Sequence, residues 1–156
     1  MDMKERKIKA GFTLIELTIA LAIFVVIAGV AIVSLNPIGQ FSKARNSQRE
    51  LHLQALMGAI RQNAADSGTG IFTCAGGTIP TSTKRMAIGA ANYDIAGCIV
   101  PTYLITLPFD PSTSSARYVS NTDYDTGYLI LRNASTGAVT LSAPAAELGK
   151  IISITR

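Results

Sequence analysis

The stretch Gly11-Phe12-Thr13-Leu14-Ile15-Glu16-Leu17 decides the fold, because it opens a run of 19 residues, Leu17 to Leu35, without a charged side chain. At about 1.5 Å per residue, a helix over that run would span roughly 28 Å, close to the ~30 Å hydrocarbon core of a membrane. We therefore expect a membrane-spanning helix over residues 12–35. An ionised carboxylate in such a segment costs roughly 2.5–3.5 kcal/mol, so Glu16 is predicted to be functional and to have a partner.

Basic residues before the apolar run indicate how it is oriented. They are Lys4, Arg6, Lys7 and Lys9. The positive-inside rule then places the N-terminus in the cytoplasm and everything after about Asn36 outside. The alternative is an ordinary secretory signal, which would have an apolar region of ~7–15 residues and an A-x-A-like site after it. The sequence Ser34-Leu35-Asn36-Pro37 does not look like such a site.

The net charge of +4 is concentrated near the start of the chain. Four basic and two acidic residues give the first eleven residues a net +2, which leaves only about +2 for the rest. A general basic field for binding nucleic acid is therefore not predicted.

A second helix is expected after a short interruption. Pro37 and Gly39 lie in the sequence Asn36-Pro37-Ile38-Gly39, which should kink or break the helix where the membrane ends. Apolar residues then recur at helical spacing, which predicts an amphipathic helix from Phe41 to about Ala65, within residues 36–65. Its apolar face comprises Leu53, Leu56, Met57, Ile60 and Ala64.

Residues 66–156 are expected to form a small sheet domain outside the cell membrane. Strands are predicted at Arg117–Ser120, Gly127–Arg132, Ala138–Ser142 and Lys150–Thr155. The segment Ile71–Leu107 has no firm period and is expected to be an irregular, disulfide-pinned loop with room for one short helix or strand. Cys74 and Cys98 are the two cysteines, and with His52 they cannot fill a zinc site. We expect them to form a disulfide in the oxidising compartment, worth about 3 kcal/mol in the chain-entropy model. The predicted fold class is α+β, a long N-terminal helix packed on an antiparallel sheet.

The basic leader, Gly11, the sequence Phe12-Thr13-Leu14-Ile15-Glu16 and the apolar run together resemble the class III signal of bacterial type IV pilins and type II secretion pseudopilins. The resemblance implies that prepilin peptidase removes residues 1–11 and methylates the new amine of Phe12. It also implies that the apolar helix is kept, first as a membrane anchor and then as the core of a fibre. The long helix and small sheet extend the likeness to the whole chain.

The chemistry of Phe12 and Glu16 agrees with that implication. A free α-amine has a pKa near 8 and is mostly cationic at pH 7. Glu16 lies about one helical turn from Phe12, so in a staggered stack the amine of one chain could meet the Glu16 carboxylate of another. An unpaired charge in that core would be costly, which makes Glu16 a device that sets the register between subunits.

Three aspartates form the acidic cluster of the sheet domain: Asp110, Asp123 and Asp125. Asn121-x-Asp123-x-Asp125 begins like an EF-hand loop, but Thr126 replaces the turn glycine and Arg132 the closing glutamate. Tyr103 to Pro111 resembles the segment that leads to the calcium site of major pseudopilins. Calcium is thus one interpretation, and solvated turn aspartates are the other. No catalytic set is predicted, since His52 is the one histidine.

The sequence therefore predicts a structural subunit of a type IV pilus-like filament, not an enzyme. Its expected partners are other copies of itself in a helical homopolymer, prepilin peptidase and the inner-membrane assembly machinery. It would lie in the cytoplasmic membrane as a single-pass prepilin before becoming an extracellular or periplasmic filament. The alternatives are a type II secretion pseudopilin, a DNA-uptake minor pilin, for which nucleic acid would be a ligand, and a membrane-anchored binding module that never polymerises.

Overall fold

A computed structural model describes residues 11–34 and 36–156 of the chain. The chain divides into two compact units, Met1–Gln40 and Phe41–Arg156. The predicted leader, residues 1–11, lies outside the described residues except for Gly11.

The first helix, α1, covers Leu14–Ser34, and none of its 21 residues is buried. It is long and apolar enough to cross a membrane. It starts two residues later than predicted because Thr13 serves as its N-cap, with a side-chain oxygen that accepts from the backbone N–H of Glu16 at 3.3 Å. The predicted last residue of the span, Leu35, lies outside the described residues.

The second helix, α2, covers Pro37–Asp66. Asn36 has a positive φ of 41° and caps this helix, because its side-chain oxygen accepts from the backbone N–H of Gly39 at 3.2 Å. Pro37 occupies the first helical position, which has no need of an N–H donor. The predicted interruption is thus present before Pro37. The prediction was wrong for Gly39, which belongs to the first turn of α2, where a Cβ would lie 3.0 Å from the Asn36 side chain.

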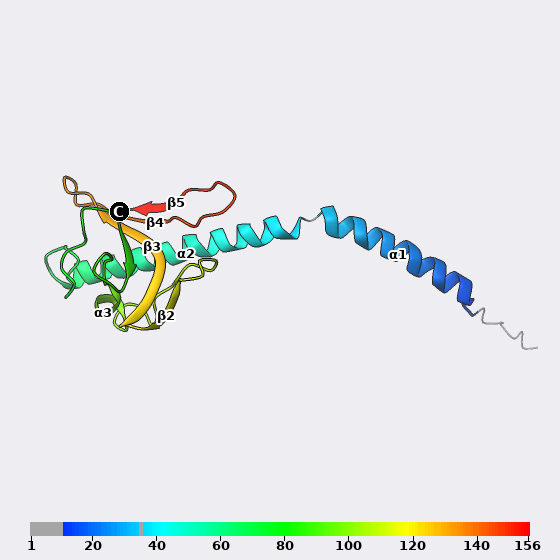
Figure 1. The fold of residues 1–156 in the computed structure, drawn as a ribbon, viewed down its shortest axis with the longest axis horizontal. Helices are drawn as coiled ribbons and strands as arrows, with labels where there is room; N and C mark the ends of the chain where they lie inside the picture. The colour runs from blue at the N-terminus through cyan, green and yellow to red at the C-terminus, as the bar shows by residue number, and fades with distance from the viewer. Residues whose placement is uncertain (1–10, 35) are drawn as a thin grey trace, which may run out of the picture. The chain divides into compact units, whose positions relative to one another are not determined.

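Five strands form one antiparallel sheet in the order β1-β3-β4-β5, with β2 also paired to β3 (Figure 1). Their bounds are β1 Lys84–Ala87, β2 Arg117–Ser120, β3 Asp123–Arg132, β4 Val139–Ala143 and β5 Ile152–Thr155. The long strand β3 organises the sheet, since β2 pairs with its first half and β4 with its second half. This arrangement confirms the predicted α+β fold.

Between those two halves, the loop that precedes β2 reaches β3. The Asp110 N–H donates to the Thr126 carbonyl at 2.8 Å. Gly127 has φ +76°, and a Cβ there would lie 2.9 Å from the Asp110 Cβ. The glycine therefore allows the close approach of this loop to the sheet.

The segment Ile71–Leu107 was expected to hold one short helix or strand, and it contains two short elements whose positions the sequence did not predict. They are β1 and the short helix α3, Ala96–Ile99. β1 is only four residues long and begins with Lys84 and Arg85, so it lacks the apolar alternation that marks a strand. β3 also starts at Asp123, four residues before the predicted strand, because two aspartates in it are neutralised by arginines of the flanking strands.

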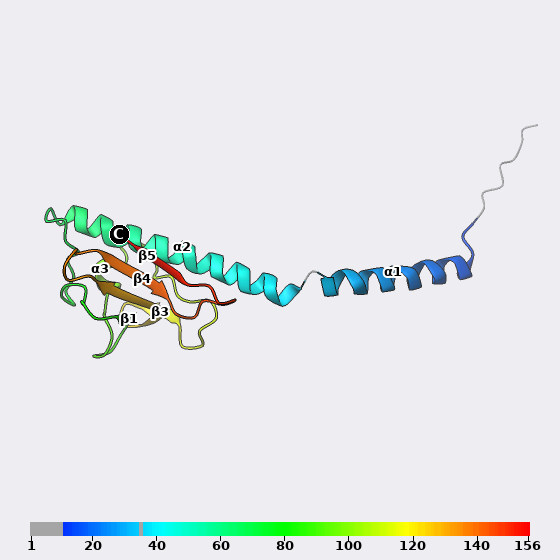
Figure 2. The same ribbon diagram turned by 90° about the horizontal axis from the view of Figure 1, so that it is seen from above.

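The core of the second unit lies between α2 and the sheet, which run alongside each other in Figure 2. The predicted apolar face of α2 is buried there at Leu53, Leu56, Met57 and Ile60, while Ala64 is half-buried. Fully buried side chains from the sheet include Tyr128, Ile130 and Leu141.

A disulfide joins Cys74 to Cys98, as predicted. It holds the irregular segment near the C-terminal end of α2, where the Asn63 side chain donates to the Cys98 carbonyl at 3.3 Å. The same side chain accepts from the Thr73 N–H at 2.9 Å. One amide side chain of α2 therefore binds both arms of the disulfide loop.

Candidate functional site

The bond between Gly11 and Phe12 lies in an exposed, non-helical segment just before α1. The Phe12 side chain is 87% exposed. Nothing lies within 4 Å of the position that a Cβ on Gly11 would occupy. Nothing in the described fold therefore requires a glycine at position 11. A peptidase that binds the residue before the cleaved bond in a narrow site would require a residue without a side chain there.

Thr13 and Glu16 form a capping box at the start of α1. The Glu16 Oε2 atom accepts from the Thr13 N–H at 2.9 Å and from the Thr13 hydroxyl at 2.8 Å. The Thr13 hydroxyl oxygen in turn accepts from the Glu16 N–H. This is the S/T-x-x-E pattern that satisfies the free N–H groups of a helix start. This role of Thr13 was not predicted from the sequence, although the spacing of Thr13 to Glu16 was a signal for it.

The other carboxylate oxygen of Glu16 is free to bind a second group. Both hydrogen bonds from Thr13 go to Oε2, and within residues 11–34 and 36–156 no donor contacts Oε1. A carboxylate can accept about four hydrogen bonds. The first turn of α1 thus presents a partly satisfied negative charge next to the Gly11–Phe12 bond.

A second polar site lies inside the sheet domain, where α2 carries a fully buried arginine. Arg49 donates from Nε to Asp110 Oδ2 at 2.8 Å and from Nη2 to Asp110 Oδ1 at 3.2 Å. Its Nη1 atom donates to Asn46 at 2.8 Å and to Glu147 at 3.0 Å. Arg45 adds a bidentate contact to Glu147 at 2.6 and 2.7 Å. We call Arg45, Arg49, Asp110 and Glu147 the ion-pair network.

The ion-pair network joins two distant parts of the chain to one helix. Asp110 precedes β2, and Glu147 lies between β4 and β5. The Glu147 backbone is also held by Asn46, which donates to its carbonyl at 2.8 Å and accepts from its N–H at 3.0 Å. In the part of the chain that the structure describes, no buried side-chain nitrogen or oxygen lacks a partner. A buried charge pair is tolerated only when its hydrogen bonds are satisfied in this way.

The ion-pair network lowers the pKa of both its carboxyl groups. Burial alone would raise the pKa of Asp110, but hydrogen bonds from Arg49 and from the Ser112 and Thr113 N–H groups outweigh it and lower the pKa to about 2. Hydrogen bonds from Arg45 and then Arg49 lower the pKa of Glu147 to about 2 as well. Both carboxyl groups are therefore ionised in the folded domain at neutral pH.

Acid should destabilise the domain through these two carboxyl groups. Their ordinary pKa values are 3.8 and 4.5, so the unfolded chain binds more protons than the folded one as the pH falls. The free energy of unfolding should hence be fully retained above about pH 4.5 and should decrease towards pH 2. Denaturant titrations at a series of pH values would measure this, and Glu147→Gln should flatten part of the decrease. A profile that is the same in this variant would contradict the assignment.

The structure does not bring the three predicted calcium candidates together. Asp110 contacts Arg49, Asp123 contacts Arg117 at 2.6 Å, and Asp125 contacts Arg85 at 2.6 Å. Among the described residues no three acidic, histidine or cysteine side chains are grouped as metal ligands. The structure supports neither interpretation of Asp110, as a solvated turn residue or as a calcium ligand, because its side chain is fully buried against Arg49.

His52 is half-buried on α2 and contacts a tyrosine of the sheet. Its Nδ1 atom lies 2.8 Å from the hydroxyl of Tyr128, which is fully buried. Burial lowers the pKa of His52, with a smaller opposing effect of the Asp110 charge. The contact with Tyr128 therefore joins His52 of α2 to the sheet.

These features define a class of protein, a chain whose exposed, apolar first helix is long enough to cross a membrane and begins with a carboxylate in its first turn. The comparisons agree: residues 6–32 match the family model described as the prokaryotic N-terminal methylation motif. The chain therefore carries a class III prepilin signal of the pilin and pseudopilin type, which supports a type IV pilin or pseudopilin precursor. No curated protein and no solved structure matches the chain significantly.

Proposed function

We propose that the chain is a structural subunit of a type IV pilus-like filament with surface functions of the adhesion or motility type. Prepilin peptidase cuts after Gly11 and methylates the amine of Phe12, and α1 then leaves the membrane to form the filament core. The observation that carries the proposal is the first turn of α1, where an exposed cleavable bond lies beside a carboxylate with one unoccupied oxygen.

In the filament, the Glu16 carboxylate binds the Phe12 amine of a neighbouring subunit. The Thr13 contacts occupy Oε2, so Oε1 can accept from the amine without loss of the capping box. The apolar side chains of α1 support the same arrangement, because none is buried within its own subunit and all can pack on lipid or on neighbouring helices. Charge matching at one axial position then sets the register of the stack.

The class III prepilin signal is equally compatible with two related functions. A type II secretion pseudopilin would form a short periplasmic filament, and a DNA-uptake minor pilin would expose a basic surface to nucleic acid. A third alternative, from another class, is a processed chain that stays in the membrane as an anchored binding module. The filament proposal rests on Glu16, since a module that remains monomeric in lipid has no use for a charge at that depth.

Mass spectrometry of the mature protein tests the processing step. In cells that contain a prepilin peptidase, the mature chain should begin at Phe12 and carry the mass of one methyl group on its amine. Gly11→Val should leave the full precursor in the membrane fraction. Gly29→Val is a matched control, because nothing lies within 4 Å of a Cβ at either glycine, and its product should be cleaved normally. A mature protein that still begins at Met1 would refute the proposal.

Electron microscopy of material sheared from the same cells separates the filament from the module. Filaments built from the processed chain support the proposal. Processed chain that is found only as a monomer in the membrane fraction supports the anchored module instead. Cells that yield filaments only when a secretion system is overproduced would indicate the pseudopilin.

A further inference from the structure

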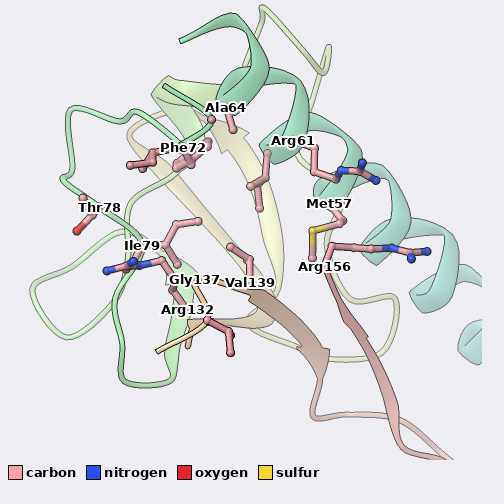
Figure 3. Close-up of a pocket in the computed structure, with 14 residues that line it drawn as sticks. Met57, Arg61, Ala64, Phe72, Thr78, Ile79, Arg132, Gly137, Val139 and Arg156 are labelled. Carbon is pink, nitrogen blue, oxygen red and sulfur yellow. The ribbon is translucent and has the colours of Figure 1, made fainter. Parts of the chain in front are cut away.

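A cavity of about 470 Å³ opens between α2, the disulfide-held segment and the end of the sheet (Figure 3). Its walls are mostly apolar and include the buried side chains of Met57, Ile60, Phe72 and Ile79. The volume lies in the range of pockets that hold small molecules, about 300–1,000 Å³. Such pockets typically combine apolar walls with a few polar groups, which fix the orientation of the ligand.

The charged groups that line this cavity are three arginines from different elements. Arg61 comes from α2, Arg132 ends β3, and Arg156 follows β5. In Figure 3 the head groups of Arg61 and Arg156 extend outward on the α2 side of the pocket, and that of Arg132 extends outward on the opposite side, near Ile79. The guanidinium groups therefore lie at the rim of the pocket, on two of its sides.

Among the described residues, these arginines have no acidic partner. The residues that line the cavity include no aspartate or glutamate. Every other arginine from Arg45 onward forms an ion pair, but within residues 11–34 and 36–156 no carboxylate side chain lies in ion-pair distance of Arg61, Arg132 or Arg156. A terminal carboxylate on Arg156 would still leave the lining net positive.

Two of the arginines are held in place by their backbones. The Arg156 N–H and carbonyl both pair with Val139, at 3.0 and 2.7 Å. The Arg132 N–H donates to the Pro80 carbonyl at 2.8 Å. The backbones of these two arginines are therefore fixed at the cavity, and the Arg132 side chain is also held there, because its Nε atom donates to the Ile79 carbonyl at 3.4 Å.

We propose that this cavity binds a small amphiphilic carboxylate, with its apolar body against Met57 and Ile79 and its carboxylate on the arginines. Guanidinium groups bind carboxylates through charge-assisted, often bidentate hydrogen bonds. The apolar walls would remove the hydrocarbon part of such a molecule from water. This binding concerns the sheet domain and is independent of cleavage after Gly11.

Methyl NMR of the full chain in phosphatidylcholine nanodiscs, titrated with octanoate, tests the proposal. The methyl signals of Met57, Ile60 and Ile79 should shift and saturate. Those of Ile105 and Ile151, which are 89% and 91% exposed outside the cavity, should stay in place. Octanol has the same tail without the charge, and acetate has the charge without the tail. Each should bind at least about tenfold more weakly, as expected for the loss of a hydrogen bond to a charged group or of apolar burial.

Variants identify the groups that bind. The double variant Arg61→Gln/Arg156→Gln should weaken octanoate binding by about tenfold or more. Lys84→Gln, which removes a positive charge of β1 outside the cavity, should leave it unchanged. Ala64→Phe should abolish binding by filling the cavity while all three arginines remain.

Several results would overturn the proposal. They are the absence of saturable shifts, equal binding of octanol or acetate, and octanoate binding that survives the loss of both arginines. Shifts of the same methyl groups that appear on raising the protein concentration without octanoate would show that a second copy of the chain occupies the cavity instead.

Discussion

Replacing Arg49 by methionine should lower the free energy of unfolding of the sheet domain by about 3–5 kcal/mol. The side chain is fully buried and donates to Asp110, Glu147, Asn46 and Ser112. Its loss leaves the fully buried Asp110 carboxylate without a counter-charge. Since whole domains are stable by only about 5–15 kcal/mol, this one change removes a large share of the total.

Two further variants show whether the unpaired charge causes that loss. Adding Asp110→Asn to the Arg49→Met chain removes the charge and should restore part of the stability. Arg45→Gln is the control, because Arg45 is 32% exposed and pairs with Glu147 alone, and it should change the stability by less than about 1 kcal/mol. Denaturant unfolding, followed by the near-ultraviolet circular dichroism of the tyrosines, measures all three. Equal losses for Arg45→Gln and Arg49→Met would contradict the buried-charge account.

Replacing Glu16 by glutamine should reduce the association of subunits by about a hundredfold or more while leaving cleavage intact. Glutamine can still accept from Thr13 in a capping box, so the start of α1 is preserved. It cannot neutralise the amine of a neighbouring subunit, and breaking a buried ion pair costs about 3–5 kcal/mol. The yield of sheared filaments, relative to the mature subunit in the membrane, measures the effect.

Thr13→Val is the complementary variant, because it removes the capping hydroxyl and keeps the charge. Loss of a helix cap costs about 1 kcal/mol, so filament yield should fall by less than tenfold. The two variants therefore separate the role of the Glu16 carboxylate in capping α1 from its role in binding the amine of a neighbouring subunit. If Thr13→Val reduced the yield as strongly as Glu16→Gln, Glu16 would act through the helix start and not through its charge.

The sequence predicted those parts of the molecule that follow from local patterns. The apolar run predicted α1, and the helical spacing from Leu53 onward predicted α2. The strands predicted at Gly127–Arg132 and Ala138–Ser142 correspond to the second half of β3 and to β4. The presence of two cysteines in the part of the chain expected outside the membrane predicted the disulfide between them. Each of these signals lies within a short stretch of chain.

The ion-pair network and the cavity could not be predicted in this way, because they depend on contacts between distant residues. Arg49 is 61 residues from Asp110 and 98 from Glu147. The available signal was the spacing of these residues along α2. Ser42, Asn46 and Arg49 extend the apolar face of the helix from Leu53 towards its N-terminus at helical spacing, so they face the core although they are polar. A charged residue on that face predicts a buried partner without saying which one.

The way α2 is bound to the sheet domain determines how the domain would respond to a pulling force. Near the N-terminal end of its packed part, the ion-pair network and Asn46 bind the segment around Glu147. Near the C-terminal end, Asn63 binds the disulfide loop. A force directed along the helix axis would have to break both sets of contacts and the apolar core between them together. A force that peels one end away would break them in succession, so the domain should resist tension along the helix better than tension across it.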